Sequence, residues 1–174
     1  DYFAFINDKN YFSPRFSVNV PVTGKLSLTG AYGIFYQSPS YIWLVSNEEN
    51  KNLKNIKAEH YVGGIEYILT SDMKFSIEGY YKKYSDYPAS TVRNYLILAN
   101  QGGDFQNVGD FGLEPLVSAG TGYSKGIEFF FQKSLTDKFY GTVSFSYFDA
   151  KFIALDGIER ESDFNNRFLF SANA

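Results

Sequence analysis

The amino-acid sequence predicts an all-β protein, an antiparallel up-and-down meander of long strands that is part of a larger transmembrane β-barrel. Three observations support this: apolar and polar residues alternate over long runs, polar turns join these runs in pairs, and short connections alternate with long ones. Alternation with a period of two indicates a strand with one apolar and one polar face. The two runs of the clearest pair, in residues 123–152, are each about ten residues long, which exceeds the ~5–6 residues usual in soluble domains and matches the ~9–11 residues of a tilted membrane-spanning strand.

The composition excludes several classes of protein. The chain has 174 residues, of which 20% are charged, and its formal net charge is −3 at pH 7. A chain with this charge has no basic field to hold nucleic acid, so we expect no nucleic-acid partner. It contains no cysteine, so disulfides, thiolate metal sites and cysteine nucleophiles are excluded. No segment has the ~18 apolar residues of a spanning helix, which does not bear on a barrel, where apolar and polar residues alternate.

The first two strands are predicted at residues 13–20 and 25–36, after an aromatic stretch without a clear period. The turn between them contains Pro21, which cannot donate to a strand ladder, and Gly24, which supplies turn dihedrals. Residues 37–57 are predicted as a long outward-facing loop, in which a cysteine at Asn50 should react with an external reagent.

The next two strands are predicted at residues 58–69 and 73–84, joined by a tight turn at 70–72. The longest irregular segment then covers residues 85–122, with an apolar island at 95–98 that could form a short strand. No convincing helix is expected anywhere in the chain.

The clearest hairpin spans residues 123–152, with a polar turn at 134–138. A polar loop follows to residue 166, and a last strand starts at Arg167. The hairpin residues expected to face lipid are Ile127, Phe129, Phe131, Val143 and Phe145. The tyrosines expected at membrane–water interfaces are Tyr32, Tyr36, Tyr61, Tyr67, Tyr81, Tyr84, Tyr123 and Tyr147.

The lengths of the connections favour an outer-membrane barrel over a soluble meander. Short connections at residues 21–24, 70–72 and 134–138 alternate with long ones at 37–57, 85–122 and 153–166. Loops beyond ~12–15 residues are uncommon in compact domains unless they are functional. Outer-membrane barrels have short periplasmic turns and long extracellular loops.

Four stretches of the chain together resemble a known family. They are SPRFSVNVPVTGKLSLTGAYGIFYQSP, NLKNIKAEHYVGGIEYILTSDMKFSIEGYYKKYSDY, YSKGIEFFFQKSLTDKFYGTVSFSYFDAKF and FNNRFLFSANA. In this order they resemble the β-barrel of TonB-dependent outer-membrane receptors, over nearly the whole chain. The resemblance implies a segment of a roughly 22-stranded barrel that is occluded by an amino-terminal plug.

The resemblance also implies a function in the bacterial cell outer membrane. Such receptors bind a scarce ligand, such as a siderophore, cobalamin or a glycan, and admit it to the periplasm with energy supplied through TonB. The expected partners are outer-membrane lipid, a small extracellular ligand, the TonB complex through the plug region, and a surface lipoprotein. Residues 1–174 would form a partial barrel of about seven strands, with the plug and the remaining strands outside them.

Two alternatives stay open: a passive porin-like barrel, and a soluble β-rich carbohydrate-binding or adhesion module. A plug upstream of residue 1 would argue against the porin, and a need for detergent would argue against the soluble module.

Ligand selection is expected on the long loops, because binding residues concentrate on loops above a rigid scaffold. The candidate ligand-binding residues are Tyr41, Trp43, Arg93, Tyr95 and Gln101. Aromatic side chains offer stiff contact area for sugar rings or planar chelates, and an arginine can pair with a carboxylate. The alternative is that Trp43 and Tyr95 only pack the loops together.

No enzymatic activity, catalytic residue, metal site or cofactor is expected. His60 is the single histidine, and on a polar strand face it is expected to be a wall residue. The carboxylates of Glu66, Glu78 and Glu128 are expected to line a polar lumen. The acidic residues of the last loop do not have the spacing of an EF-hand, and they are expected to form a solvated loop; they are Asp156, Glu159, Glu161 and Asp163.

Overall fold

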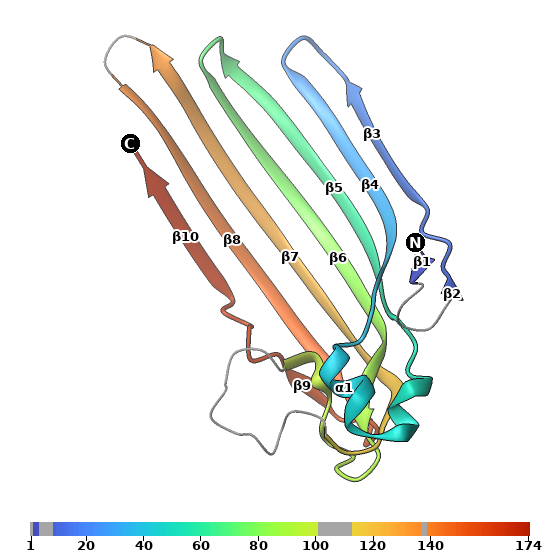
Figure 1. Ribbon diagram of the computed structural model, residues 1–174. Coiled ribbons are helices and arrows are strands. Elements are labelled where there is room, and N and C mark those ends of the chain that lie inside the picture. Colours follow the sequence, from blue (N-terminus) through green and yellow to red (C-terminus); the bar gives the residue numbers. More distant parts are fainter. Residues whose placement is uncertain (1, 4–8, 101–112, 137–138) are drawn as a thin grey trace.

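The computed structural model describes residues 2–3, 9–100, 113–136 and 139–174, and within them one antiparallel sheet dominates (Figure 1). Its strands follow the order β10-β8-β7-β6-β5-β4-β3, so each strand from β3 to β8 pairs with its neighbours in the sequence. The strands are β3 (Arg15–Pro21), β4 (Leu26–Gln37), β5 (Ile56–Thr70), β6 (Met73–Ser90), β7 (Leu116–Thr136), β8 (Phe139–Ile153) and β10 (Phe168–Asn173). The predicted all-β meander of long strands is therefore confirmed.

Smaller elements lie outside this path. Strands β1 (Tyr2–Phe3) and β2 (Lys9–Asn10) form a separate pair, and β9 (Glu159–Glu161) pairs with β8. The helical elements are α1 (Tyr41–Ser46) and the 3-10 helices η1 (Glu48–Asn52) and η2 (Leu98–Asn100). No helix among the described residues is long and apolar enough to cross a membrane.

The strand register brings the alternating apolar residues onto one face of the sheet. Leu28, Ile65, Ile77, Phe129 and Phe145 follow one another across five strands as successive Cα partners. Ile65, Ile77 and Phe145 are each at least 40% exposed, so no second layer covers them within the described residues. A broad apolar sheet face left uncovered is typical of a surface that contacts lipid.

Tyrosines form a second row on the same face, nearer the long connections. The rings of Tyr32 and Tyr61 lie 5.0 Å apart, those of Tyr61 and Tyr81 6.4 Å apart, and those of Tyr81 and Tyr123 6.2 Å apart. Tyr84 is a correction to the predicted set. It lies on the opposite, polar face. Its Cα partners are Ala58 and Gly122, and each is an odd number of residues from the tyrosine of the row on its own strand. Alternate residues of a strand point to opposite faces.

The polar face carries the charged residues expected to line a lumen. Lys74 Nζ lies 3.2 Å from Glu66 Oε2 on the neighbouring strand. Glu78 and Glu128 are directly opposed Cα partners on β6 and β7. Two like charges in direct opposition destabilise an isolated sheet, which indicates that this face is adapted to water or to a polar neighbour.

Short and long connections lie at opposite ends of the sheet (Figure 1). The short-turn end is fastened by Asp72, which accepts hydrogen bonds from Thr70 Oγ1 and Thr136 Oγ1, each at 2.7 Å, and from Lys133 Nζ. These contacts join the β5–β6 turn to the β7–β8 hairpin. They lower the pKa of Asp72, the hydrogen bond from Lys133 contributing most.

Three boundaries differ from the sequence predictions. The expectation of no helix is wrong, because α1 and η1 occupy the first long connection. Strand β6 extends to Ser90 and strand β7 begins at Leu116, so the second long connection is shorter than predicted. The island predicted at 95–98 contributes one bridge, between Ile97 and Ala89, and then enters η2.

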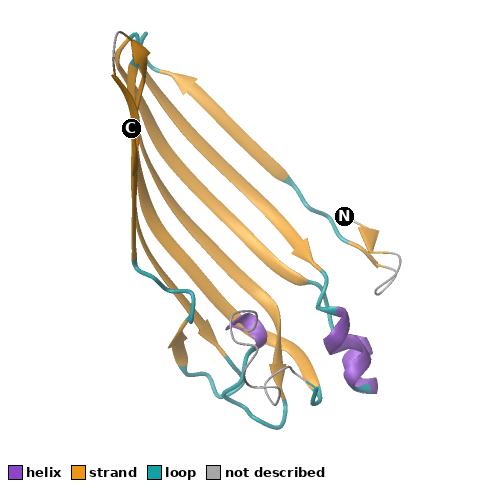
Figure 2. Cartoon of the chain, turned by 60° about the vertical axis from the view of Figure 1, so that its left-hand side comes forward, coloured by secondary structure: helices purple, strands orange, loops and turns teal. Residues whose placement is uncertain are grey.

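The buried apolar residues gather at the end of the sheet with the long connections. Figure 2 shows the helices and long loops at this end. One cluster contains Leu44, Leu53, Leu98 and Leu116, and the other contains Ile97, Phe152 and Ala154. This packing fixes the loops to the sheet.

Candidate functional site

The long connections form one packed unit, which we call the loop cap: α1, η1, residues 91–100 and residues 113–115. Trp43 and Leu96 pack against the cluster of Leu44, Leu53, Leu98 and Leu116. The cluster therefore takes residues from the first connection, from the second connection and from the start of β7. The loop cap is held by the same burial of apolar area that stabilises a small core.

Asn50 fastens the two connections to each other. Its side chain is fully buried. Asn50 Nδ2 donates to Trp43 O at 2.8 Å and to Glu114 O at 3.1 Å, while Asn50 Oδ1 accepts from Leu116 N at 2.7 Å. The prediction that a cysteine at this position would react with an external reagent is wrong, because the side chain is buried. Nothing in the local sequence marks Asn50 as a buried residue, because two of its partners, Glu114 and Leu116, lie more than 60 residues away.

Trp43 and Arg93 help to build the loop cap. Trp43 is partly buried, and its carbonyl oxygen accepts hydrogen bonds from Asn50 Nδ2 and from Ser46 Oγ at 2.9 Å. Arg93 Nε lies 3.1 Å from Glu114 Oε1 and 3.2 Å from Oε2, with both side chains largely buried. Arg93 thus joins two parts of the second connection.

Tyr41 and Tyr95 are placed differently, because both project from the loop cap. Tyr41 is 74% exposed and Tyr95 is 57% exposed. Ile42 and Val45 add apolar surface to α1. Gln101 lies outside the described residues. Of the five candidates, two are therefore available to a ligand, two support the loop cap, and one has no structural description.

The second connection folds onto the polar face of the wall. A Cβ at Gly120 would lie 2.5 Å from Ile97 Cδ1, so glycine is needed for Ile97 to sit against β7. Phe152 covers Gly122 in the same way. Tyr84 and Tyr87 pack against these residues, with the rings of Tyr87 and Phe152 5.4 Å apart. The loop cap is therefore seated at the mouth of the lumen-facing surface.

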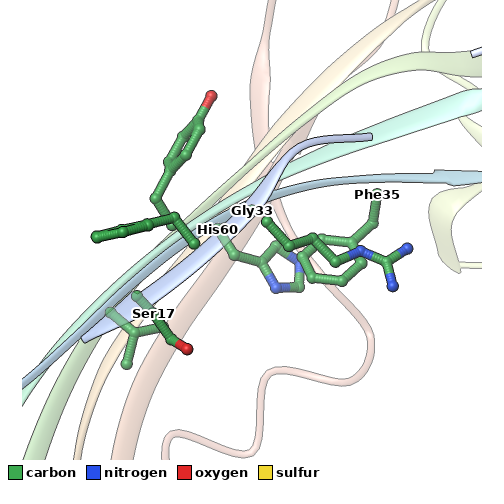
Figure 3. A pocket seen from close by; sticks show the side chains of 9 residues that line it. Ser17, Gly33, Phe35 and His60 are labelled. Carbon is green, nitrogen blue, oxygen red and sulfur yellow. The ribbon is translucent and has the colours of Figure 1, made fainter. Parts of the chain in front are cut away.

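The polar wall also carries a shallow pocket on β3, β4 and β5 (Figure 3). Figure 3 shows the ring of Phe35 beside that of His60, and the two ring centroids are 4.5 Å apart. The guanidinium carbon of Arg15 lies 4.6 Å from the Phe35 ring centroid. A Cβ at Gly33 would lie 2.8 Å from Phe35 Cε2, so the ring folds back over this glycine. His60 thus lies on the wall against the tilted ring of Phe35, with Lys82 as its Cα partner.

The last acidic loop is neutralised by cationic side chains. Asp156 accepts from Arg160 at 3.0 Å, Glu159 from Lys151 at 2.8 Å, and Glu161 from Arg167. Arg160 and the backbone N–H of Ile158 lower the pKa of Asp156 to about 2. The described residues contain no group of three or more His, Asp or Glu able to hold a metal ion. The three paired carboxylates do not support a calcium site.

A family model described as TonB dependent receptor-like, beta-barrel matches residues 1–172. The comparison with curated proteins gives no match. The family match covers almost all of the chain and agrees with the meander, the exposed apolar face and the distribution of turn lengths.

Proposed function

Because the chain belongs to the family of TonB-dependent receptor β-barrels, whose members are outer-membrane transporters, we propose that its loop cap helps to select a small extracellular ligand for uptake. The ligand would be of the siderophore, cobalamin or glycan type. TonB would supply energy through a plug, and a surface lipoprotein would be a further partner. The protein would act as a receptor and transporter and not as an enzyme.

The exposure of Tyr41 and Tyr95 on a packed scaffold is the observation that carries this proposal. Tyrosine provides a large contact surface with few rotatable bonds, so little side-chain entropy is lost on binding. The scaffold below is pre-organised by Asn50 and by the Arg93–Glu114 pair. Pre-organisation reduces the cost of ordering a binding site.

The polar wall supports transport through the same barrel. Arg15, His60 and Lys82 lie near the loop cap, and Glu78 and Glu128 lie farther along the wall towards the short turns. A polar lumen agrees with passage of a hydrophilic ligand or with contact to a polar plug.

The test uses the complete receptor that contains this segment, expressed in cells without other receptors of the same type. Uptake of ferric chelates, cobalamin and oligosaccharides identifies the ligand class. Tyr41→Ala combined with Tyr95→Ala should then weaken binding of that ligand by roughly ten- to a hundredfold, the size of losing two aromatic contacts. Surface display should not change, because both side chains are exposed.

Tyr140→Ala is the matched control, since Tyr140 is 56% exposed but lies at the end of the sheet with the short turns. Trp43→Ala with Arg93→Ala should reduce binding only together with increased proteolysis of the loop cap. Unchanged binding by the displayed Tyr41/Tyr95 variant would exclude the loop cap as the selector. Uptake that continues without TonB would favour the passive porin.

A further inference from the structure

The apolar face has a groove on its central strands, β4 to β8. Gly63 and Gly79 form its floor, and Tyr61, Tyr81 and Ile127 are among the side chains that border it. The groove lies away from the edge strands β3 and β10. It is therefore not a gap that a neighbouring strand of the barrel would fill.

The space above the groove floor is not filled by this chain. A Cβ at Gly63 would meet no atom within 4 Å, and one at Gly79 would approach only backbone oxygens at 3.9 Å. Glycine inside a strand weakens it, and it often marks a place where another molecule approaches closely. The polar-face glycines Gly120 and Gly122 differ, because side chains of this chain already cover them.

The groove runs from a polar end to an apolar end. Lys125 and Asp149 line it and are Cα partners of each other, in the same row as Tyr81. The next row on this face towards the loop cap contains Lys83 and Lys151. Charged side chains are unfavourable in hydrocarbon, so the membrane boundary lies at the tyrosine row. The glycine floor lies on the hydrocarbon side of that boundary.

The charges at the polar end suit a headgroup that contains both a phosphate and hydroxyl groups. Lys125 is exposed, and its Nζ lies 5.4 Å from the Tyr123 ring centroid. Its ammonium group can donate to a phosphate. Asp149 Oδ1 accepts from Asn165 Nδ2 at 3.3 Å, and its carboxylate can accept further hydrogen bonds from sugar hydroxyls. Tyr61 and Tyr81 provide flat walls for an acyl chain.

We propose that this groove binds one acyl chain of a phosphorylated glycolipid of the outer leaflet, with the phosphate at Lys125 and a sugar hydroxyl at Asp149. We assign the outer leaflet because the groove lies at the membrane boundary nearest the long connections, which are expected to face the outside of the cell. A second barrel fits less well, because two convex barrel surfaces meet along a line and leave a groove between strands unfilled. A single acyl chain is thin enough to reach the glycine floor.

The test is native mass spectrometry of the complete receptor in detergent, titrated with hexa-acylated bis-phosphoryl lipid A. The unmodified receptor should retain this lipid more strongly than phosphatidylglycerol. Gly63→Ile with Gly79→Ile should fill the groove and reduce retention at least tenfold. Gly24→Ile is the control, because a Cβ at Gly24 would also meet no atom within 4 Å, but Gly24 lies in the turn after β3 and does not line the groove. It should leave retention unchanged.

A second variant tests the headgroup contact. Lys125→Gln should weaken retention of bis-phosphoryl lipid A by roughly fivefold, the size of one exposed ion pair. Its effect on retention of lipid A from which both phosphate groups have been removed should be negligible. Since this change replaces one exposed side chain by another, it remains a test even if the double glycine variant does not assemble.

Several results would overturn the proposal. They are retention of lipid A by an assembled double glycine variant, equal retention after Lys125→Gln, equal or tighter binding of phosphatidylglycerol, and absence of bound lipid on the unmodified receptor. A receptor dimer that the double glycine variant dissociates would show that the groove is an interface between copies. Ligand uptake is measured separately, so failure here leaves the proposed function standing.

Discussion

Introducing a charge on the apolar face is the most direct test of how the sheet sits in the membrane. Ile127 lies on β7 and is 56% exposed, with Gly79 and Tyr147 as Cα partners. Ile127→Lys places an ammonium group on the lipid side. Glu128→Lys places the same group one residue away on the polar face, opposite Glu78.

The depth of Ile127 in the membrane, which follows from its position on β7, sets the expected loss of stability. Ile127 is two residues beyond Lys125, which at ~3.4 Å per residue and a tilt of ~45° is about 5 Å deeper in the membrane. In an apolar band ~25 Å tall, this is less than halfway to the midplane. A lysine costs about 2–4 kcal/mol at the midplane and about 0–1 kcal/mol near the interface, so we expect Ile127→Lys to cost about 2 kcal/mol. Phe129→Lys lies two residues deeper and should cost about 3 kcal/mol.

The assay is urea unfolding of the complete receptor in phospholipid vesicles, with the folded fraction read from the electrophoretic mobility of unheated samples. The destabilisation should increase from Glu128→Lys through Ile127→Lys to Phe129→Lys, with Glu128→Lys within about 1 kcal/mol of the unmodified receptor. Equal losses at Ile127 and Glu128 would refute the assignment of the two faces. A smaller loss at Phe129 than at Ile127 would refute the depth calculation.

Three further predictions concern the ends of the sheet. Asn50→Ala should leave the barrel assembled but lower the free energy of local unfolding of the loop cap by about 2 kcal/mol, because it leaves buried backbone groups unpaired. Faster hydrogen exchange in residues 41–55 would show this, and unchanged exchange would contradict it. The lowered pKa of Asp72 stabilises the folded state above the ordinary carboxyl pKa of ~3.9, and this stability is lost as the pH falls towards the folded-state value; Asp72→Asn should therefore remove part of the acid sensitivity of unfolding, and an identical pH profile would count against it. A cysteine at Glu48, whose side chain is 95% exposed, should react with an impermeant thiol reagent on whole cells while one at Ser71 should not, and the reverse result would invert the topology.

Local periodicity was sufficient to predict the faces of the strands. Ile127, Phe129 and Phe131 share a period of two, with polar Glu128 and Gln132 between or beside them and Phe130 as the exception. A strand places alternate residues on opposite faces whatever its partners are. The turns at Gly24 and Asp72 were also predictable, because their residue types favour turns locally.

The true ends of β6 and β7 were not predictable, because pairing between distant strands overrides local breaking signals. Pro88 and Gly120 both suggested irregular structure. Pro88 is accommodated opposite Ser118, beside a register shift that contains Asp86 at a φ of 59°. Gly120 provides the space into which Ile97 packs.

The loop cap could not be predicted from the sequence, because it is formed by contacts between distant segments. Polar residues around Asn50 gave no sign that this amide is buried, since its burial is offset by hydrogen bonds to Glu114 and Leu116, more than 60 residues away. The sequence predicted Trp43 and Arg93 as ligand contacts from their chemistry, and the fold directs them to cluster packing and an ion pair. A strand face follows from the geometry of the backbone itself, but a loop residue is placed by contacts that form only when distant segments meet.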